Sequence, residues 1–391
     1  MNLNEIAAAL GVENYSHKLI KVFENLDKVC VDPCDKTFLE NFEKEFNILK
    51  EHYESVLKAA EDIKNDPVRY PWVKTVATAI KTGVLRDGND IPTPVSDKTL
   101  VGDWMPLLML LPSIPDVQAF YRKLGFDEAD VNNVLQSFYR GIESSQKNMG
   151  RPGYNRSYFN WQLTYVRGEL FRFKSFNYEL RSMPCGYILK NRENGTILPL
   201  TSGGKYHRSG MELGSAGFED EEGSFEATFT ETEDAYIGHP AVDFRILKKA
   251  QTYLKTEWEC VLRPGDNIVS VHIPAKTDLS PEAVEKSYTE GLEFIDKFFP
   301  HFKPKAYFCN SWLMDPHLAE ILGNESKIAQ FQNGFTRWAS ASNGKEIFSF
   351  VFVGFKGEIK DLPEDTTLMR GIKKLYLEGD YILGYNGVLF R

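Results

Sequence analysis

A histidine near the end of a strand-like run is the first side chain that could carry chemistry. His272 lies in the run 267–273, where alternation places it on the same side as Ser270 and Ile268. An imidazole changes charge near neutral pH and can take a proton from a nucleophile, so His272 is a candidate general base. A hydrogen-bonded structural histidine is the alternative interpretation.

Two carboxylates provide a second candidate base. Glu257 and Glu259 flank Trp258 in the run 255–263, which has the composition of a strand. Because side chains alternate along a strand, both carboxylates lie on one face, where simple exposure to solvent is the alternative. The choice between these carboxylates and His272 stays open at this point.

The thiols do not indicate a metal centre. Five cysteines are spread along the chain, an odd number in a protein large enough to need no covalent crosslinks, so we expect reduced thiols. Cys30 and Cys34 have a spacing that two metal ligands use, but no second Cys or His pair lies at ligand spacing nearby. We therefore expect a loop between helices there and no metal site.

The elements around His272 follow from local signals. The turn at 263–266 contains Pro and Gly and predicts a hairpin that joins a strand at 255–263 to the strand at 267–273. Ser280 as N-cap and Pro281 at the first helical position predict a helix over 281–298, followed by a strand at 305–309. Beyond them we expect helices at 313–322, 325–335 and 366–378, and strands at 346–353 and 381–390.

The first part of the chain has helical periodicity. Apolar residues three and four apart predict one long amphipathic helix from an N-cap at Asp35 through about residue 60. The segment 148–153 contains two glycines and a proline, so we place a boundary there, between a helical domain at 1–148 and a second domain at 149–391. Further helices are expected at 16–29, 70–83, 103–111, 114–123 and 127–142, and strands at 168–178, 185–190, 196–201 and 224–230.

Length and charge limit the class of protein. At 391 residues the chain is long enough for two domains. Its 55 acidic against 46 Lys and Arg residues give a net charge of −9, which disfavours a nucleic-acid partner because no large basic surface is left to neutralise phosphates. The longest apolar run, near 106–111, is too short to span a membrane. We expect a cytoplasmic protein.

Several short motifs carry a resemblance to a known family. They are His272-Ile273-Pro274-Ala275, Leu279-Ser280-Pro281-Glu282-Ala283, Cys309-Asn310-Ser311-Trp312-Leu313-Met314-Asp315-Pro316-His317-Leu318 and Phe331-Gln332. This half resembles the GNAT-like C-terminal domain of bacterial acyltransferase-like proteins, and the helical half resembles the domain that accompanies it. The resemblance covers nearly the whole chain. It implies an α+β protein, with an all-helical N-terminal domain followed by a GNAT-like mixed β-sheet flanked by helices.

The resemblance also implies a binding site for acyl-CoA or acetyl-CoA. In GNAT enzymes the strands before and after the long helix diverge, and the pantetheine arm lies between them, where its amides bond to open backbone groups. The strands at 267–273 and 305–309 would be that pair, with the pyrophosphate at the N-terminus of helix 281–298. The cofactor-binding residues would be Val271, Ile273, Ala275, Lys276, Thr277 and Asn310.

One departure from the family concerns the phosphate loop. GNAT proteins usually have a Gln/Arg-x-x-Gly-x-Gly/Ala loop, whereas the stretch 275–280 contains no glycine. Side chains there crowd the close approach that glycine allows, and Asp278 repels phosphate. Lys276 and Thr277 remain as candidate phosphate contacts.

Acyl transfer to an amine needs a base for the ammonium proton and a donor for the departing thiolate. On the resemblance, His272 is the first candidate base and Glu257 or Glu259 the alternatives. The Tyr that GNAT enzymes commonly use as acid is missing from 313–322, and Tyr307, Cys309 and Ser311 lie nearest the expected thiolate.

The predicted function is therefore N- or O-acyl transfer from acyl-CoA to a small-molecule or peptide acceptor. A non-catalytic ligand-binding protein on the same scaffold is the alternative. Pocket shape decides the acceptor, and sequence patterns do not deliver it.

Overall fold

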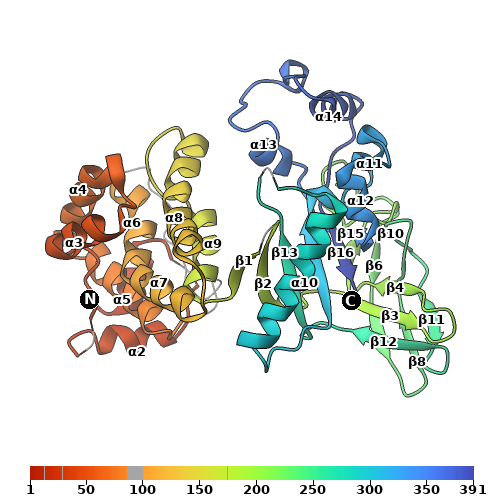
Figure 1. Cartoon of the computed structure of the whole chain (residues 1–391), viewed down its shortest axis with the longest axis horizontal. Helices are drawn as coiled ribbons and strands as arrows, with labels where there is room; N and C mark the ends of the chain where they lie inside the picture. Colours follow the sequence, from red (N-terminus) through yellow and green to blue (C-terminus); the bar gives the residue numbers. More distant parts are fainter. Residues whose placement is uncertain (13, 29, 86–99, 174, 276) are drawn as a thin grey trace. The chain divides into compact units, whose positions relative to one another are not determined.

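The computed structural model describes residues 1–391 except 13, 29, 86–99, 174 and 276. The chain forms two compact units, Met1–Leu170 and Phe171–Arg391, which are described separately (Figure 1). The first is helical, and the second is built on a six-stranded sheet.

The first unit is a helical bundle. Its α-helices are α1 (Leu3–Ala9), α2 (Lys18–Glu24), α3 (Lys36–Phe46), α4 (Tyr53–Lys64), α5 (Arg69–Lys81), α6 (Leu100–Leu110), α7 (Ile114–Lys123), α8 (Glu128–Met149) and α9 (Arg156–Val166). The ends of α8 show how local sequence sets these bounds: the Asp127 carboxylate caps its start, and Gly150 closes it in the left-handed conformation. In the described ranges every helix is too short or too polar to cross a lipid bilayer.

The single long helix expected after Asp35 is wrong, because the chain breaks it into α3 and α4. Asn47 adopts a left-handed conformation with φ of 47° and ends α3. The Glu43 carboxylate then accepts the backbone N–H groups of Ile48, Leu49 and Lys50, at 2.7–3.1 Å. In a continuous helix these N–H groups would bond to backbone carbonyls, and here the carboxylate takes the place of those carbonyls. The chain can therefore bend while its apolar residues keep the same spacing.

The segment 148–153 packs back onto the bundle. Within this segment, the Arg151 guanidinium donates to the carboxylate of Asp103 in α6. Just after the segment, the Tyr154 N–H donates to the Asp103 carbonyl at 2.8 Å. Asn155 then caps α9. The helical unit therefore includes α9 and extends to Leu170, beyond the residues 1–148 assigned to it from the sequence.

A mixed sheet forms the centre of the second unit. Its strand order is β1-β2-β13-β14-β16-β15, in which β13 runs parallel to β14 and antiparallel to β2. The bounds are β1 (Leu170–Phe173), β2 (Phe176–Ser182), β13 (Asn267–His272), β14 (Ala306–Ser311), β15 (Thr336–Ala339) and β16 (Tyr385–Leu389). The helix between β13 and β14, α10 (Pro281–Phe298), agrees with the prediction of 281–298.

Smaller sheets surround this centre. They are β12-β3-β4, β11-β8-β7, β5-β6 and β10-β9. The strands are β3 (Tyr187–Asn191), β4 (Ile197–Leu200), β5 (Gly204–Tyr206), β6 (Phe225–Ala227), β7 (Phe229–Glu231), β8 (Ala235–Gly238), β9 (Ala241–Val242), β10 (Arg245–Ile246), β11 (Gln251–Leu254) and β12 (Trp258–Leu262).

The hairpin predicted at 263–266 is wrong. Strand β12 pairs with β3 in a small sheet, whereas β13 pairs with β2 and β14. The Met183 N–H donates to the Asp266 carbonyl, and the Gly265 N–H donates to the Met183 carbonyl, so the turn packs on the chain after β2. A tight turn thus carries the chain from one sheet to another, which the turn residues alone do not distinguish from a hairpin.

Helix α10 covers one face of the central sheet (Figure 1). The Tyr307 hydroxyl of β14 donates to the Tyr288 carbonyl of α10 at 2.8 Å, and the Tyr178 hydroxyl of β2 lies 2.9 Å from the Ser287 hydroxyl. A Cβ at Gly291 would lie 2.5 Å from the Tyr178 ring, so glycine permits this close approach. These contacts fix α10 against both β2 and β14.

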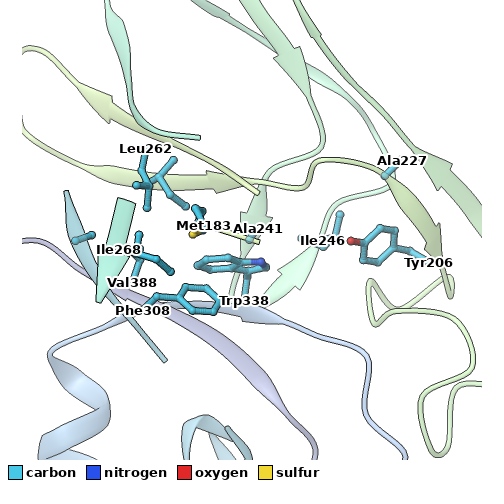
Figure 2. Packing of buried hydrophobic residues seen from close by; sticks show 12 residues of the cluster. Met183, Tyr206, Ala227, Ala241, Ile246, Leu262, Ile268, Phe308, Trp338 and Val388 are labelled. Atoms are coloured by element: carbon cyan, nitrogen blue, oxygen red, sulfur yellow. The ribbon is translucent and has the colours of Figure 1, made fainter. Parts of the chain in front are cut away.

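The opposite face packs on the small sheets. Figure 2 shows the apolar cluster between the layers, where Ile268 of β13, Phe308 of β14 and Trp338 of β15 meet Leu262 of β12. The rings of Phe308 and Trp338 are 6.2 Å apart. Side chains on this face are therefore part of the core in the N-terminal part of β13 and of β14.

The C-terminal part also differs from expectation at the segment 346–353. The remaining helices are α11 (His317–Leu322), α12 (Lys327–Asn333), α13 (Glu346–Phe350) and α14 (Thr367–Leu377). The strand predicted at 346–353 is wrong, since helix α13 occupies most of it and buries Ile347 completely. Short apolar runs have no decisive period, so tertiary packing sets their conformation.

Candidate active site

The two parallel strands of the central sheet diverge at their C-terminal ends. In the described register, β13 and β14 pair only at Ile268↔Ala306, Val269↔Tyr307 and Ser270↔Phe308. Beyond that point the rest of β13 pairs with β2, and the rest of β14 pairs with β16. The opening between the two strands beyond Ser270 and Phe308 is called the strand gap below.

His272 and Asn310 stand on the two sides of the strand gap. Each lies two residues beyond the last paired rung, Ser270↔Phe308, so alternation puts both side chains on the face opposite α10. The Asn310 amide donates to the Ser340 hydroxyl at 2.9 Å and to the Asn386 side-chain oxygen at 2.8 Å. These bonds join the β14 side of the gap to β16 and to the chain after β15.

His272 is held by a carboxylate from the neighbouring strand. Its Nε2 lies 2.9 Å from Oε2 of Glu179, which is placed on the same face by the register of β2 against β13. The Glu179 side chain is 11% exposed and that of His272 31%, so the pair leads from the interior to the gap. The Arg181 guanidinium lies 3.7 Å from the same carboxylate oxygen.

Sequence reasoning missed Glu179. The strand Phe176–Ser182 alternates Asn177, Glu179 and Arg181 with apolar residues, and β2 is an interior strand of the sheet. Polar residues at every second position of an interior strand signal either a solvated face or a site. That signal was present, but its pairing with His272 was not readable without the register.

The carboxylates predicted as alternative bases lie on a different sheet. Glu257 precedes β12 and Glu259 lies within it, and both are exposed. Glu259 pairs with the Arg192 guanidinium at 3.2 Å across the small sheet. Both carboxylates therefore lie in or directly before a strand of the sheet β12-β3-β4, whereas the strand gap lies in the central sheet.

Of the three groups considered as acid, Tyr307 and Ser311 have structural partners and Cys309 is buried. Tyr307 points to the α10 face and donates to the Tyr288 carbonyl. The Ser311 hydroxyl accepts the Leu313 N–H at 3.1 Å and caps the short 3-10 helix that follows β14. Cys309 is fully buried, and burial raises the pKa of its thiol to about 12. Tyr307 thus donates its proton to a backbone carbonyl, and burial disfavours ionisation of the Cys309 thiol.

The loop between β13 and α10 holds itself in place. The Thr277 hydroxyl lies 2.7 Å from the Pro274 carbonyl oxygen and 3.0 Å from the Ser175 carbonyl oxygen, which share its one proton. Thr277 therefore anchors the loop to the chain before β2, which differs from the phosphate contact expected of it. Ala275 is exposed, and Lys276 lies outside the described residues.

The other two residues expected at the cofactor are apolar and flank His272. Val271 is buried, at 2% exposure, on the α10 side of β13. Ile273 is partly buried and packs against the apolar cluster that includes Leu313 and Ile347. Both contribute backbone rather than polar side chains to the edge of the gap.

The start of α10 is only partly capped. Ser280 occupies the N-cap position, as predicted, but its side chain makes no capping bond to the helix. Its hydroxyl donates to the Asp278 carboxylate at 3.0 Å instead, and Lys327 of α12 donates to that carboxylate at 2.7 Å. The Lys327 hydrogen bond is the main reason that the pKa of Asp278 falls to about 2.

The Asp-Pro motif after β14 is a structural centre. The Asp315 carboxylate, fully buried, accepts the N–H groups of His317 and Leu383 and the Nδ1 of His317, at 2.6–2.8 Å. The Gln332 amide donates to the carbonyls of Leu313 and Asp315, at 2.7 and 2.9 Å. These residues tie the end of β14 to α12 and to the chain before β16.

In the described ranges, no group of three or more His, Cys, Asp or Glu side chains is arranged to hold a metal ion. Cys30 is exposed and Cys34 is buried, and both are free thiols. Burial is the main cause that raises the pKa of Cys34 to about 12, which disfavours the thiolate that a metal would bind.

Solved structures share this fold. An acyltransferase mutant in complex with octanoyl-CoA is 16% identical, with a TM-score of 0.63, and the match covers 100% of this chain and 99% of that one. An acyltransferase in complex with decanoyl-CoA and teicoplanin is 18% identical, with a TM-score of 0.62 and the same coverage. An acyltransferase in complex with CoA and 10C-Teicoplanin is 16% identical, also with a TM-score of 0.63 and the same coverage.

A search of curated proteins found no match. The family model of the GNAT-like C-terminal domain matches residues 170–389, which include the strand gap, α10 and the Asp315 motif. With more than half of its length matched, the chain belongs to the family defined by the GNAT-like C-terminal domain.

Proposed function

We propose that this protein is an acyl-CoA-dependent acyltransferase that acts on an amine or hydroxyl of a small-molecule or peptide acceptor. The observation that carries the proposal is the divergence of β13 and β14 next to His272. The structural neighbours with CoA, octanoyl-CoA, decanoyl-CoA and teicoplanin support it, since they share the fold over the whole chain. The cytoplasmic location stays a prediction.

In this proposal the cofactor arm lies in the strand gap. Backbone groups that β13 and β14 no longer exchange with each other bond to the two amides of the pantetheine arm. The phosphates lie at the start of α10, where the helix dipole and first-turn N–H groups attract anions and Ser280 leaves the helix without a side-chain cap. The acyl thioester then lies between His272 and Asn310.

The proton then moves as follows in the proposed reaction. His272 takes a proton from the acceptor nitrogen or oxygen as this atom attacks the thioester carbonyl carbon. The tetrahedral intermediate collapses, the C–S bond breaks, and CoA leaves as a thiolate. Because the Tyr307 hydroxyl already donates to a backbone carbonyl, we assign the return of the proton to the departing sulfur to the His272 imidazolium.

The test uses the purified full chain. We expect decanoyl-CoA to bind in a calorimeter and to raise the melting temperature. With a panel of amines and hydroxyl compounds, free thiol should form at a rate that depends on both substrates. Binding without thiol release for any acceptor would contradict the transferase activity. No binding of any acyl-CoA would overturn the proposal and favour the non-catalytic ligand-binding protein.

A first prediction concerns Asp278 at the start of α10. Asp278→Asn removes a negative charge from the proposed phosphate site and releases Lys327 from its ion pair. We expect the dissociation constant of CoA to fall by about two- to fivefold, the size of a single exposed charge at a helix N-terminus. Calorimetry at low salt measures this change, and added salt should reduce it.

The chain offers a matched control on the same helix. Asp296 is exposed near the other end of α10 and pairs with Lys303 at 2.8 Å. Asp296→Asn changes the charge equally and should leave CoA affinity unchanged. Equal effects of the two substitutions would place the phosphates somewhere other than the start of α10.

A further inference from the structure

Glu179 is a carboxylate in an interior strand, and its position needs a physical reason. It lies on β2 opposite Ser270 of β13 and is 8% exposed. A nearly buried carboxylate is costly unless it is paired and hydrogen bonded. Nε2 of His272 lies 2.9 Å from its Oε2, and the Arg181 guanidinium lies 3.7 Å from the same oxygen.

We propose that Glu179 is a positioning residue that fixes the ring orientation and the tautomer of His272, which rests on the proposed function for its catalytic meaning. A carboxylate accepts, so the hydrogen bond at 2.9 Å places the proton of the neutral imidazole on Nε2. The lone pair is then on Nδ1. This is the atom that takes the proton from the acceptor.

The same carboxylate also acts after the proton has moved. When Nδ1 is protonated the imidazole becomes a cation, and both of its nitrogens then donate. The Glu179 carboxylate lies within hydrogen-bond distance of that cation in a nearly buried position, where charges interact more strongly than in water. Glu179 therefore stabilises the imidazolium that forms when His272 takes the acceptor proton.

Geometry distinguishes this role from simple packing. The neighbour of Glu179 on the same face of β13 toward the core is Ile268, within the apolar cluster between the layers. The carboxylate lies where that cluster ends and the strand gap begins, and the side chain that it holds is 31% exposed at the gap. The carboxylate therefore joins the buried part of the sheet to a side chain that reaches the gap.

The kinetic test uses Glu179→Gln in the full chain, because Gln has nearly the same shape. We expect kcat to fall at least about tenfold. The loss should not exceed the loss caused by His272→Gln. The dissociation constant of decanoyl-CoA and the melting temperature should stay within error of the wild type. Glu259→Gln, which removes an exposed strand carboxylate paired with Arg192, is the matched control and should keep full activity.

A double substitution separates positioning from independent action. If Glu179 acts through His272, adding Glu179→Gln to His272→Gln should lower kcat little further. Two losses that multiply would overturn the proposal. A weaker affinity for decanoyl-CoA with unchanged kcat would also overturn it, because it would assign Glu179 to binding.

An activity-independent readout tests the geometry itself. In protein labelled with 15N-histidine, the His272 signals, identified by their loss in His272→Gln, should show the Nε2–H tautomer at high pH. In Glu179→Ala we expect a mixture of tautomers with altered shifts. Unchanged His272 signals would overturn the proposal even if no acceptor is found, whereas altered signals in a protein without turnover would leave the pair standing and remove only the proposed function.

Discussion

His272→Gln is expected to lower the rate of acyl transfer by about a hundredfold or more. Glutamine keeps a polar group near the Glu179 carboxylate but has no basic nitrogen to take the acceptor proton. The rate of CoA thiol release at saturating decanoyl-CoA, with the best acceptor from a panel, measures the loss. Because the cofactor arm is proposed to bond to backbone groups in the strand gap, the dissociation constant of decanoyl-CoA should not change.

Controls for this prediction come from the alternative candidates. Glu257→Gln and Glu259→Gln should keep wild-type turnover, since both carboxylates are exposed and β12 belongs to another sheet. Tyr307→Phe should also keep turnover, at a cost in stability from the lost bond to the Tyr288 carbonyl. Turnover that survives in His272→Gln and fails in Tyr307→Phe would contradict the assigned roles.

Asp315→Ala is expected to destabilise the second unit by about 3–5 kcal/mol. The substitution leaves the His317 and Leu383 N–H groups without their acceptor in a region where Leu383 is 2% exposed. Urea unfolding followed by tryptophan fluorescence measures the free energy. Hydrogen exchange should show faster exchange of the Leu383 amide and of α11. Helix α8 in the first unit serves as the internal reference and should exchange as in the wild type.

His317→Gln is the milder control for Asp315, and its effect depends on pH. The hydrogen bond to Asp315 is the largest cause that raises the pKa of His317 above its usual value. A raised pKa in the folded state stabilises the protein fully below the unfolded value of about 6.5, and this stabilisation is lost as pH rises through the folded pKa. The free energy of unfolding of the variant should therefore fall furthest below that of the wild type at pH 5 to 6. A difference that grows with pH would contradict the assignment.

Local signals predicted the elements that hold the site. The N-cap and first-turn residues Ser280 and Pro281 fixed α10, and the strands on either side of it were found with the correct order. The sequence also predicted that these strands diverge, through the resemblance to the family, and the register of β13 against β14 agrees. These features depend on residues close together in the chain.

Features that depend on distant residues were not predictable in this way. The turn at 263–266 has hairpin residues, yet its partner is Met183, some eighty positions earlier in the chain. Helix α13 forms because Ile347 is buried in a tertiary cluster, not because its sequence has a helical period. The Glu43 carboxylate accepts backbone N–H groups that follow α3, such as that of Leu49, and this role becomes visible only once the bend is known.

The candidate site divides along the same line. His272 was identified by its residue type and its place on a strand, whereas Glu179 lies 93 residues earlier and meets it only through the pairing of β2 with β13. Thr277 was expected at the phosphates because of its position, but two carbonyl acceptors already use its hydroxyl. The type of a residue indicates which chemistry its side chain can carry out, but its hydrogen-bond partners in the fold decide which of these roles is available.

Each side of the strand gap has its own outer neighbour. Strand β2 pairs with β13 up to His272, and β16 pairs with β14 up to Ser311, so neither edge depends on the other for its course. The opening is thus a preorganised feature of the folded chain, and no part of the ligand's affinity is spent on parting two bonded strands. Association should then be limited by how fast a flexible arm finds its orientation, and differences in affinity among cofactors should appear mainly in how slowly they leave.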